Sequence, residues 1–312
     1  MTALQPFSDA TILAARPPKH PVDAQKPYAF LVEPEHQRSG RVEDVAVVFL
    51  TNKECPFRCL MCDLWKHTTD HRVPVGAIPA QIDYALDRLE PAKHIKLYNS
   101  GNFFDPSAIP PEDYAAIAER VKGFATVIVE NHPKLCGSRV PQFIEALRAS
   151  GSQATLEVAM GLETIHPEVL PLLNKQMTTD DFQNACQELR KLDVALRAFI
   201  LLRPPTLSES QGVEWAEKSA RFAFDSGVDT VSIIPVRAGN GLMDELQAAG
   251  QFSPPTLCSM EDVMDSLISL KRGRVFIDLW DAADTFADAR DSANRLARLH
   301  KMNLTQTVLP RV

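Results

Sequence analysis

Apolar and polar positions follow two alternating patterns between residues 42 and 236. Short apolar runs predict buried parallel strands at Val45–Leu50, Ile95–Tyr98, Thr126–Val129, Thr155–Met160, Leu196–Leu202 and Thr230–Ile234. The segments between them have a helical period and predict helices near Ile78–Leu89, Pro111–Gly123, Val140–Ser150, Thr179–Leu192 and Ser208–Ser226. A strand and a helix that recur every ~30–35 residues are typical of barrel-type winding.

The series of predicted strands then stops, and we therefore expect a barrel of about six βα units. The predicted fold class is α/β, a partial (β/α)6 TIM-like barrel with parallel strands. Residues 1–40 hold six prolines and no clear period, which predicts an extended N-terminal arm laid over the barrel. Residues 41–240 are the predicted core. Residues 241–312 are a predicted C-terminal extension with a helix, a short strand at Val275–Leu279 and a helix near Asp284–Met302.

Composition indicates a soluble, ordered protein. The chain has 312 residues, 45% hydrophobic and 23% charged, with a net charge of -7. These values argue against disorder and against strong, general binding of nucleic acid. No apolar run approaches the ~20 residues of a membrane span, and Met1–Arg16 lacks the basic and apolar stretches of a signal peptide. We therefore expect a cytoplasmic protein that does not bind membranes.

Three of the six cysteines, Cys55, Cys59 and Cys62, lie within eight residues. In a reducing compartment such a group indicates a metal site rather than disulfides. The C-x3-C-x2-C loop directly follows the first predicted strand, at the end of a barrel where active sites lie. Three thiolates can bind three irons of a cubane iron–sulfur cluster and leave one iron open. A zinc site is the alternative, with His67 or His71 as a further ligand.

This cysteine loop resembles the signature of the radical S-adenosylmethionine (SAM) superfamily. Five further stretches resemble the branch related to the Elongator catalytic subunit: Lys96–Asp105, Val129–Pro133, Gly161–Thr164, Leu202–Pro205 and Ser253–Pro255. Within that branch the chain is most similar to the radical SAM partners of archaeosine synthase, which work on a modified guanine in transfer RNA. The resemblance covers roughly residues 28–280.

The resemblance implies a [4Fe-4S] cluster and SAM as cofactors. In this family the open iron chelates SAM, and one electron releases a 5′-deoxyadenosyl radical that abstracts hydrogen from the substrate. It implies a modified nucleoside in tRNA as substrate, an electron donor such as flavodoxin or ferredoxin, and a partner subunit. A small metabolite or peptide substrate is one alternative. A non-catalytic, metal-stabilised barrel that acts as a binding module is another.

Several positions match SAM contacts of the family. Ser100, Gly101 and Asn102 follow the second predicted strand, where relatives place a glycine-rich stretch against the SAM amino group. Glu130 and Glu163 end the third and fourth strands, where the resemblance implies contacts with ribose hydroxyls. The alternatives are a salt bridge at the strand end for Glu130 and a charge at a helix N-terminus for Glu163.

Three more positions are implied as SAM contacts. Arg197, on the fifth strand, could pair with the SAM carboxylate, and a structural ion pair is its alternative. Ile234 ends the sixth strand, where relatives contact adenine, and ordinary barrel packing is its alternative. Met61 precedes the third cysteine and could hydrogen-bond adenine through its backbone.

Residues that act on the substrate are not identified by the sequence. Arg203, beside Pro204, and His132 and Cys136, just after the third strand, are the candidates. A hydrogen-bonded loop position is the alternative for His132. A small buried apolar role is the alternative for Cys136, and we expect the same role for the isolated Cys186 and Cys258.

One polar stripe is predicted on the last helix. Arg290, Asn294, Arg298 and Lys301 would line one helix face. Such a stripe could meet RNA phosphates, and a solvated face is the alternative.

Overall fold

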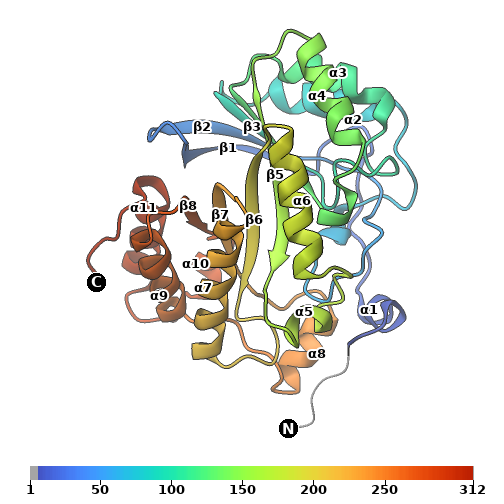
Figure 1. Ribbon diagram of the computed structural model, residues 1–312. Coiled ribbons are helices and arrows are strands. Elements are labelled where there is room, and N and C mark those ends of the chain that lie inside the picture. Colours follow the sequence, from blue (N-terminus) through green and yellow to red (C-terminus); the bar gives the residue numbers. More distant parts are fainter. Residues whose placement is uncertain (1–5, 312) are drawn as a thin grey trace.

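The computed structural model describes residues 6–311 and contains an eight-stranded sheet with its strands in chain order. Strands β2 to β8 run parallel, and β1 pairs antiparallel with β2. The sheet curls into the partial TIM-like barrel that the sequence predicts (Figure 1). The strands are β1 (Ala29–His36), β2 (Val42–Phe49), β3 (His94–Tyr98), β4 (Thr126–Asn131), β5 (Thr155–Glu163), β6 (Ala195–Leu202), β7 (Thr230–Pro235) and β8 (Arg274–Ile277).

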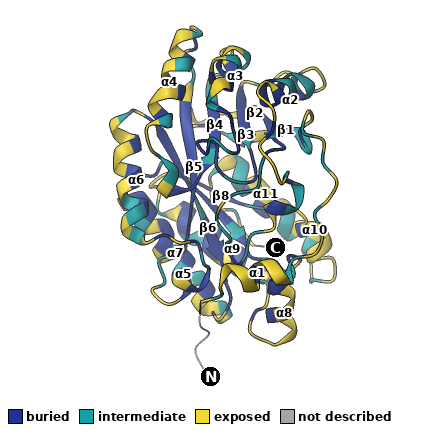
Figure 2. Ribbon diagram, turned by 90° about the vertical axis from the view of Figure 1, so that its right-hand side faces the viewer, coloured by how far each residue is buried: buried dark blue, intermediate teal, exposed yellow. Residues whose placement is uncertain are grey.

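Helices cover the outer face of the curled sheet, and Figure 2 shows buried strands inside an exposed helical layer. Apolar residues at alternate strand positions face these helices and form the main core. The helices are α1 (Asp9–Ala15), α2 (Ala77–Leu86), α3 (Tyr114–Val121), α4 (Arg139–Ala149), α5 (Val169–Leu172), α6 (Thr179–Lys191), α7 (Glu209–Asp225), α8 (Leu242–Ala248), α9 (Leu257–Ser269), α10 (Ala282–Thr285) and α11 (Ser292–Thr305).

The six predicted strands and five predicted core helices are all present, with ends that differ by a few residues. Their start signals explain the agreement. Thr178 accepts a hydrogen bond from the Asp181 N–H, and the Asp181 carboxylate accepts one from the Thr178 N–H, so α6 begins at a capping box. Ser208 and Gln211 make the same reciprocal pair at the start of α7.

The predicted N-terminal arm is wrong in part, because residues 29–36 form β1 and residues 9–15 form α1. Pro34 lies in β1 without cost because an edge strand has one side that needs no ladder hydrogen bond. The proline content of residues 1–40 therefore conceals a strand. Residues 1–5 lie outside the described part of the chain.

The C-terminal extension contributes more than predicted, because its short strand is β8, the seventh parallel strand, paired with β7. The parallel series thus exceeds the six units expected. The final predicted helix is two helices, α10 and α11. Within residues 6–311, no helix has the length and apolarity required to cross a membrane.

The polar stripe predicted on the last helix is also wrong at Arg298. This side chain is buried, donates to Asp265 Oδ1 at 2.5 Å, and donates to the carbonyl oxygens of Leu309 and Pro310. It therefore fixes the C-terminal tail against α9 and does not face solvent.

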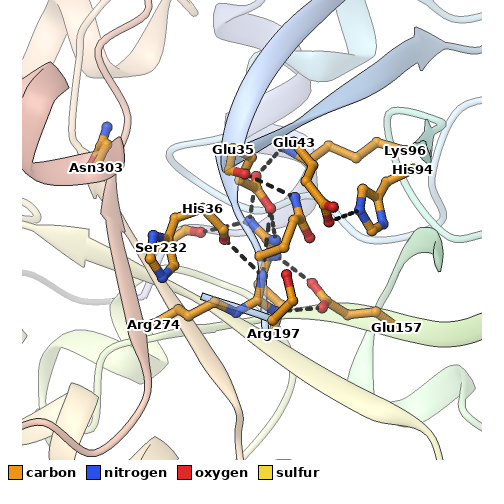
Figure 3. Close-up of polar contacts among 12 residues, drawn as sticks. Glu35, His36, Glu43, His94, Lys96, Glu157, Arg197, Ser232, Arg274 and Asn303 are labelled. Atoms are coloured by element: carbon orange, nitrogen blue, oxygen red, sulfur yellow. Dashed lines mark hydrogen bonds and ion pairs between the residues drawn. The ribbon is translucent and has the colours of Figure 1, made fainter. Parts of the chain in front are cut away.

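The inner face of the curled sheet carries a buried ion network near the amino ends of the strands, which we call the charged floor (Figure 3). Arg197 of β6 donates to Glu35 of β1 and to Glu157 of β5, each at 2.7 Å. Lys96 also donates to Glu35, and Arg274 donates to Glu157 at 3.0 Å. Because β1 and β6 lie far apart in the strand order, these bonds close the bottom of the open barrel.

Candidate active site

The cysteine loop lies at the opposite end of the barrel, between the carboxyl end of β2 and a short 3-10 helix at Leu64–His67. Leu60 anchors it: the side chain is fully buried, and its N–H donates to the Leu173 carbonyl at 2.9 Å. Asn240, in the loop after β7, donates to the carbonyls of Leu60 and Cys62 at 2.7 and 3.2 Å. Helices α1, α5 and α8 lie together at this end and pack against Leu60 (Figure 1).

The three thiols of the loop are mutual neighbours. Burial raises the pKa of Cys59 to about 12, and the nearby Cys55 thiol adds to this increase. Burial, Cys59 and Cys55 together raise the pKa of Cys62 well above its ordinary value. Burial also raises the pKa of Cys55, whose sulfur accepts a hydrogen bond from Asn102 Nδ2 at 3.1 Å. The loop therefore gathers three half-buried thiols at one place.

Three thiolates and no fourth neighbouring ligand suit a four-iron cluster with one open iron. Within residues 6–311, no group of three or more His, Cys, Asp or Glu side chains is arranged so that it could hold a metal ion. Zinc needs four ligands at one centre, whereas each cysteine of a cubane binds a different iron, so the sulfurs remain apart. His67, a possible zinc ligand, instead stacks on Tyr28 with ring centroids 4.6 Å apart.

The Ser100–Asn102 loop lies directly against the cysteine loop. A Cβ on Gly101 would be 3.1 Å from Cys55 Cβ, so glycine permits the close approach. Asn102 also accepts a hydrogen bond from the His132 N–H at 2.6 Å, which links β4 to the cysteine loop. Ser100 has a φ of 51°, a strained conformation that often marks functional loops.

Glu130 holds this loop through its backbone. Its Oε1 accepts hydrogen bonds from the N–H groups of Asn99 at 2.6 Å and Gly101 at 3.3 Å. Burial raises the pKa of Glu130 to about 6, and the backbone N–H groups partly offset that increase. This oxygen of Glu130 therefore positions the Ser100–Asn102 loop.

We expect Glu130→Gln to change how stability depends on pH. A carboxyl whose pKa is raised in the folded state costs stability as pH rises from about 4.5 to about 6. Gln keeps an acceptor oxygen and does not ionise. Between pH 4.5 and pH 7, the free energy of unfolding of the variant should therefore rise by about 2 kcal/mol relative to that of the wild type. Chemical denaturation of the unloaded protein measures this difference, with exposed Glu145→Gln as the control. If the unfolding free energies of the variant and the wild type differed by the same amount at all pH values, the raised pKa of Glu130 would be contradicted.

Glu163 forms a buried ion pair with Lys175, which the sequence reasoning missed. Lys175 Nζ lies 2.7 Å from Glu163 Oε1. Burial alone would lower the pKa of Lys175, but Glu163 and then the Cys59 and Cys55 thiols raise it above its ordinary value. Glu163 has a φ of 67° at the end of β5, so it belongs to no helix N-terminus. The pair places a fixed ammonium charge beside the thiols.

Gly161 makes room for this ion pair. A Cβ at Gly161 would overlap Glu163 Oε1 and lie 2.5 Å from Lys175 Nζ. We expect Gly161→Ala to destabilise the protein by about 1–3 kcal/mol because the buried pair must move. Gly123→Ala is the matched control, since no atom lies within 4 Å of its added Cβ. Equal unfolding free energies for the two variants in urea would contradict this prediction.

Arg197 forms a structural ion pair, which was the alternative to a contact with the SAM carboxylate. Glu35 and Glu157 bind its guanidinium in the charged floor, near the amino ends of the strands. The Ser100–Asn102 loop lies at the carboxyl ends. The proposed contact with the SAM carboxylate therefore does not fit the position of Arg197.

Two of the three candidates for substrate chemistry, Arg203 and His132, make hydrogen bonds within the protein. Arg203 donates to the Pro254 carbonyl at 2.8 Å and pairs with Glu209. His132 Nδ1 accepts from the Lys134 N–H, so Nε2 carries the proton and donates to the Lys175 carbonyl at 3.0 Å. Burial and the charge of Lys175 lower the pKa of His132 to about 3. His132 is thus a neutral, hydrogen-bonded loop residue.

The remaining cysteines differ from one another. Cys186 is buried, as expected, but Cys258 is exposed and accepts a hydrogen bond from Arg295 at 3.2 Å. Cys136 is half-buried, and burial raises its pKa to about 11, so its thiol stays protonated. Met61 and Ile234, the two predicted adenine contacts, pack against the same apolar cluster at the cysteine-loop end.

The family model of the radical SAM superfamily matches residues 50–209, more than half of the 312 residues. The chain belongs to the radical SAM superfamily and is an enzyme. Its cofactors are those of the family, a [4Fe-4S] cluster and SAM. The non-catalytic alternative is thereby set aside.

Two curated relatives are named archaeosine synthase subunit beta, which agrees with the resemblance found in the sequence. The protein from Methanosarcina acetivorans is 27% identical over 213 residues, covering 66% of this chain and 60% of the relative. The protein from Thermococcus kodakarensis is 26% identical over 215 residues, covering 66% of this chain and 65% of the relative. The match thus spans less than two thirds of these relatives.

Two solved structures share the fold. Elp3 from Methanocaldococcus infernus has a TM-score of 0.50 at 19% identity, over 66% of this chain and 52% of that chain. Methylornithine synthase has a TM-score of 0.52 at 13% identity, over 86% and 72%. At these identities the likeness establishes the partial barrel alone.

Proposed function

We propose that Cys55, Cys59 and Cys62 bind three irons of the [4Fe-4S] cluster and that SAM binds the fourth iron beside Ser100–Asn102. The observation that carries this proposal is the group of three half-buried, neighbouring thiols at the carboxyl ends of the strands. When bound, the cluster and SAM supply a 5′-deoxyadenosyl radical that abstracts hydrogen from the substrate.

Residues of this chain hold the site and shield it. Asn102 fixes the position of Cys55 through its hydrogen bond to the sulfur. Burial raises the pKa of Cys55 and Cys59, and the ammonium of Lys175 partly offsets that increase in favour of the thiolates that bind iron. Leu60 and the apolar side chains around it keep water from the loop.

The remaining SAM contacts are assigned by position. We keep Met61 and Ile234 as adenine contacts, and Glu130 and Glu163 as ribose contacts at the strand ends. Arg197 is left out, because both of its carboxylate partners lie in the charged floor.

The proposed substrate is a modified nucleoside in tRNA, and the support is similarity to two proteins named archaeosine synthase subunit beta. That name also supports a partner subunit for this chain. An electron donor such as flavodoxin or ferredoxin supplies the electron. A small metabolite or peptide is the second candidate, favoured by the net charge of -7 and by the burial of Arg298.

Nucleoside analysis tests the substrate. The cluster-loaded protein is incubated with SAM, a reductant and unfractionated tRNA, and the digested tRNA is examined by mass spectrometry. We expect one nucleoside to change mass in a SAM-dependent way, and tRNA binding to weaken steeply with salt. Unchanged nucleosides together with salt-insensitive binding would contradict an RNA substrate. The Cys59→Ser variant is the control.

A further inference from the structure

The buried ion pair of Glu163 and Lys175 lies against the cysteine loop. Lys175 belongs to the segment between α5 and α6, at the same end of the barrel as the cysteine loop (Figure 1). Glu163 is the last residue of β5. Both side chains are less than a tenth exposed, and 2.7 Å separates Lys175 Nζ from Glu163 Oε1. Because a buried ion pair often adds little stability, this position indicates a role other than holding the fold.

Two hydrogen bonds join the residues just before Lys175 to the cysteine loop. The Leu60 N–H donates to the Leu173 carbonyl at 2.9 Å. The Asn174 side chain donates to the Arg58 carbonyl at 2.8 Å. Arg58 and Leu60 are the two neighbours of the middle cysteine of the loop. The backbone that carries Lys175 is therefore fixed on both sides of that cysteine.

A third contact joins Lys175 to the first half of the loop. The Lys175 carbonyl accepts a hydrogen bond from His132 Nε2 at 3.0 Å. The His132 ring stacks on that of Phe57, with ring centroids 3.8 Å apart. Phe57 lies between Cys55 and Cys59 in the sequence. These contacts place the Lys175 segment along the part of the loop that holds the first two cysteines.

The backbone around Lys175 adopts an uncommon conformation. Asn174 and Gln176, the residues on either side of it, have φ values of 51° and 57°. Glu163 has a φ of 67°. Non-glycine residues in this conformation are destabilising, and they gather at functional sites. The strained backbone on both sides of the pair thus supports a functional placement of the two charges.

The ammonium end of the pair acts more strongly on the thiols than the carboxylate end does. Burial is the largest cause of the raised pKa of Cys59. Lys175 opposes that increase, and its effect on the pKa is larger than the further increase that Glu163 causes. Lys175 also opposes the raised pKa of Cys55. The pair is therefore a fixed dipole with its positive end toward the cysteine loop.

We propose that this pair sets the reduction potential of the cluster, which Lys175 raises and Glu163 lowers. Reduction adds one electron to a cluster that already carries thiolate charge, and a nearby fixed ammonium stabilises the added negative charge. Because the pair is buried, salt screens it little. Reduction by the electron donor would thereby become easier. This inference rests on the proposed cluster site and names two residues that tune it.

The midpoint potential of the cluster tests the inference. It is measured in the reconstituted full chain without SAM, by anaerobic redox titration followed by absorbance. Lys175→Met should lower the ratio of reduced to oxidised cluster at a fixed potential by about tenfold, which corresponds to ~59 mV for one electron. Glu163→Gln should raise this ratio by about threefold or more, because the ammonium then acts without the opposing carboxylate.

Two variants serve as controls. Lys134 Nζ donates to the carbonyl of Gln176, next to Lys175, but its side chain is half exposed. Solvent therefore screens its charge, and Lys134→Met should leave the ratio within about twofold of the wild type. Lys175→Arg keeps the positive charge and should remain within about threefold of the wild type. A pair that only holds the fold would not produce opposite shifts in Lys175→Met and Glu163→Gln.

Iron and sulfide analysis separates the two possible failures. A wild type that holds no four-iron cluster would overturn the proposed cluster site and this inference with it. If the loaded wild type and Glu163→Gln had the same potential, the inference alone would be overturned. The same holds if Lys175→Met and Glu163→Gln shifted the potential in the same direction. Gln keeps an acceptor oxygen for Lys175, so the test stands on Glu163→Gln even where Lys175→Met fails to fold.

Discussion

Cys59→Ser should leave the protein unable to hold its iron–sulfur cluster. Three half-buried thiols lie together at the carboxyl ends of the strands, and a hydroxyl is a poor substitute for a thiolate ligand of iron. After anaerobic reconstitution the wild type should contain about four irons with matching sulfide. The variant should retain little of either, and the same holds for Cys55→Ser and Cys62→Ser.

Cys136→Ser is the sharpest control for this result. Its thiol is half-buried and lies just beyond β4, yet its neighbours are Asn131 and Met160 rather than the cysteine loop. It should load the cluster as the wild type does. Full iron content in Cys59→Ser, or loss of iron in Cys136→Ser, would contradict the assignment of the ligands.

Arg197→Met should destabilise the unloaded protein by about 3–5 kcal/mol, because the substitution removes a guanidinium that pairs with two buried carboxylates, Glu35 and Glu157. Burial alone would raise the pKa of Glu35, but Arg197 and Lys96 outweigh it and hold that pKa far below the ordinary 4.5. Its stabilisation is therefore present above pH 4.5 and lost as pH falls. Unfolding in urea at several pH values should show that the unfolding free energies of the variant and the wild type differ most near neutral pH.

An exposed ion pair provides the comparison for Arg197. Arg190 pairs with Asp229 at 3.1 Å near the surface, so Arg190→Met should cost about 1 kcal/mol or less. If Arg197→Met were as stable as Arg190→Met but bound SAM poorly, the result would support a contact between Arg197 and the SAM carboxylate. It would also show that the charged floor does not stabilise the fold.

The parts of the fold that sequence predicts are those with local signals. Apolar runs locate β2 to β7, and a capping box marks the start of α6. The cysteine loop is placed correctly because its spacing and its position after a strand are both local. Strand β1 is not predicted because a proline such as Pro34 is rare in a central strand. Proline is tolerated in an edge strand, and the sequence does not show that β1 lies at the edge of the sheet.

The roles of polar residues depend on partners that sequence does not reveal. Arg197 meets Glu35, which lies 162 positions away. Lys175 has no motif of its own, and its closeness to Glu163 arises from the loop after β5. The one available signal is Gly161, two residues before Glu163. A side chain at this position would occupy the space of the Glu163–Lys175 pair.

This chain should cleave SAM at a cluster that Cys55, Cys59 and Cys62 hold. The most direct measurement is the formation of 5′-deoxyadenosine from SAM by the anaerobically reconstituted, reduced protein. We predict that the wild type produces it and that Cys59→Ser does not. A wild-type protein that carries a full cluster and yields no 5′-deoxyadenosine, or a cysteine variant that still yields it, would contradict the account.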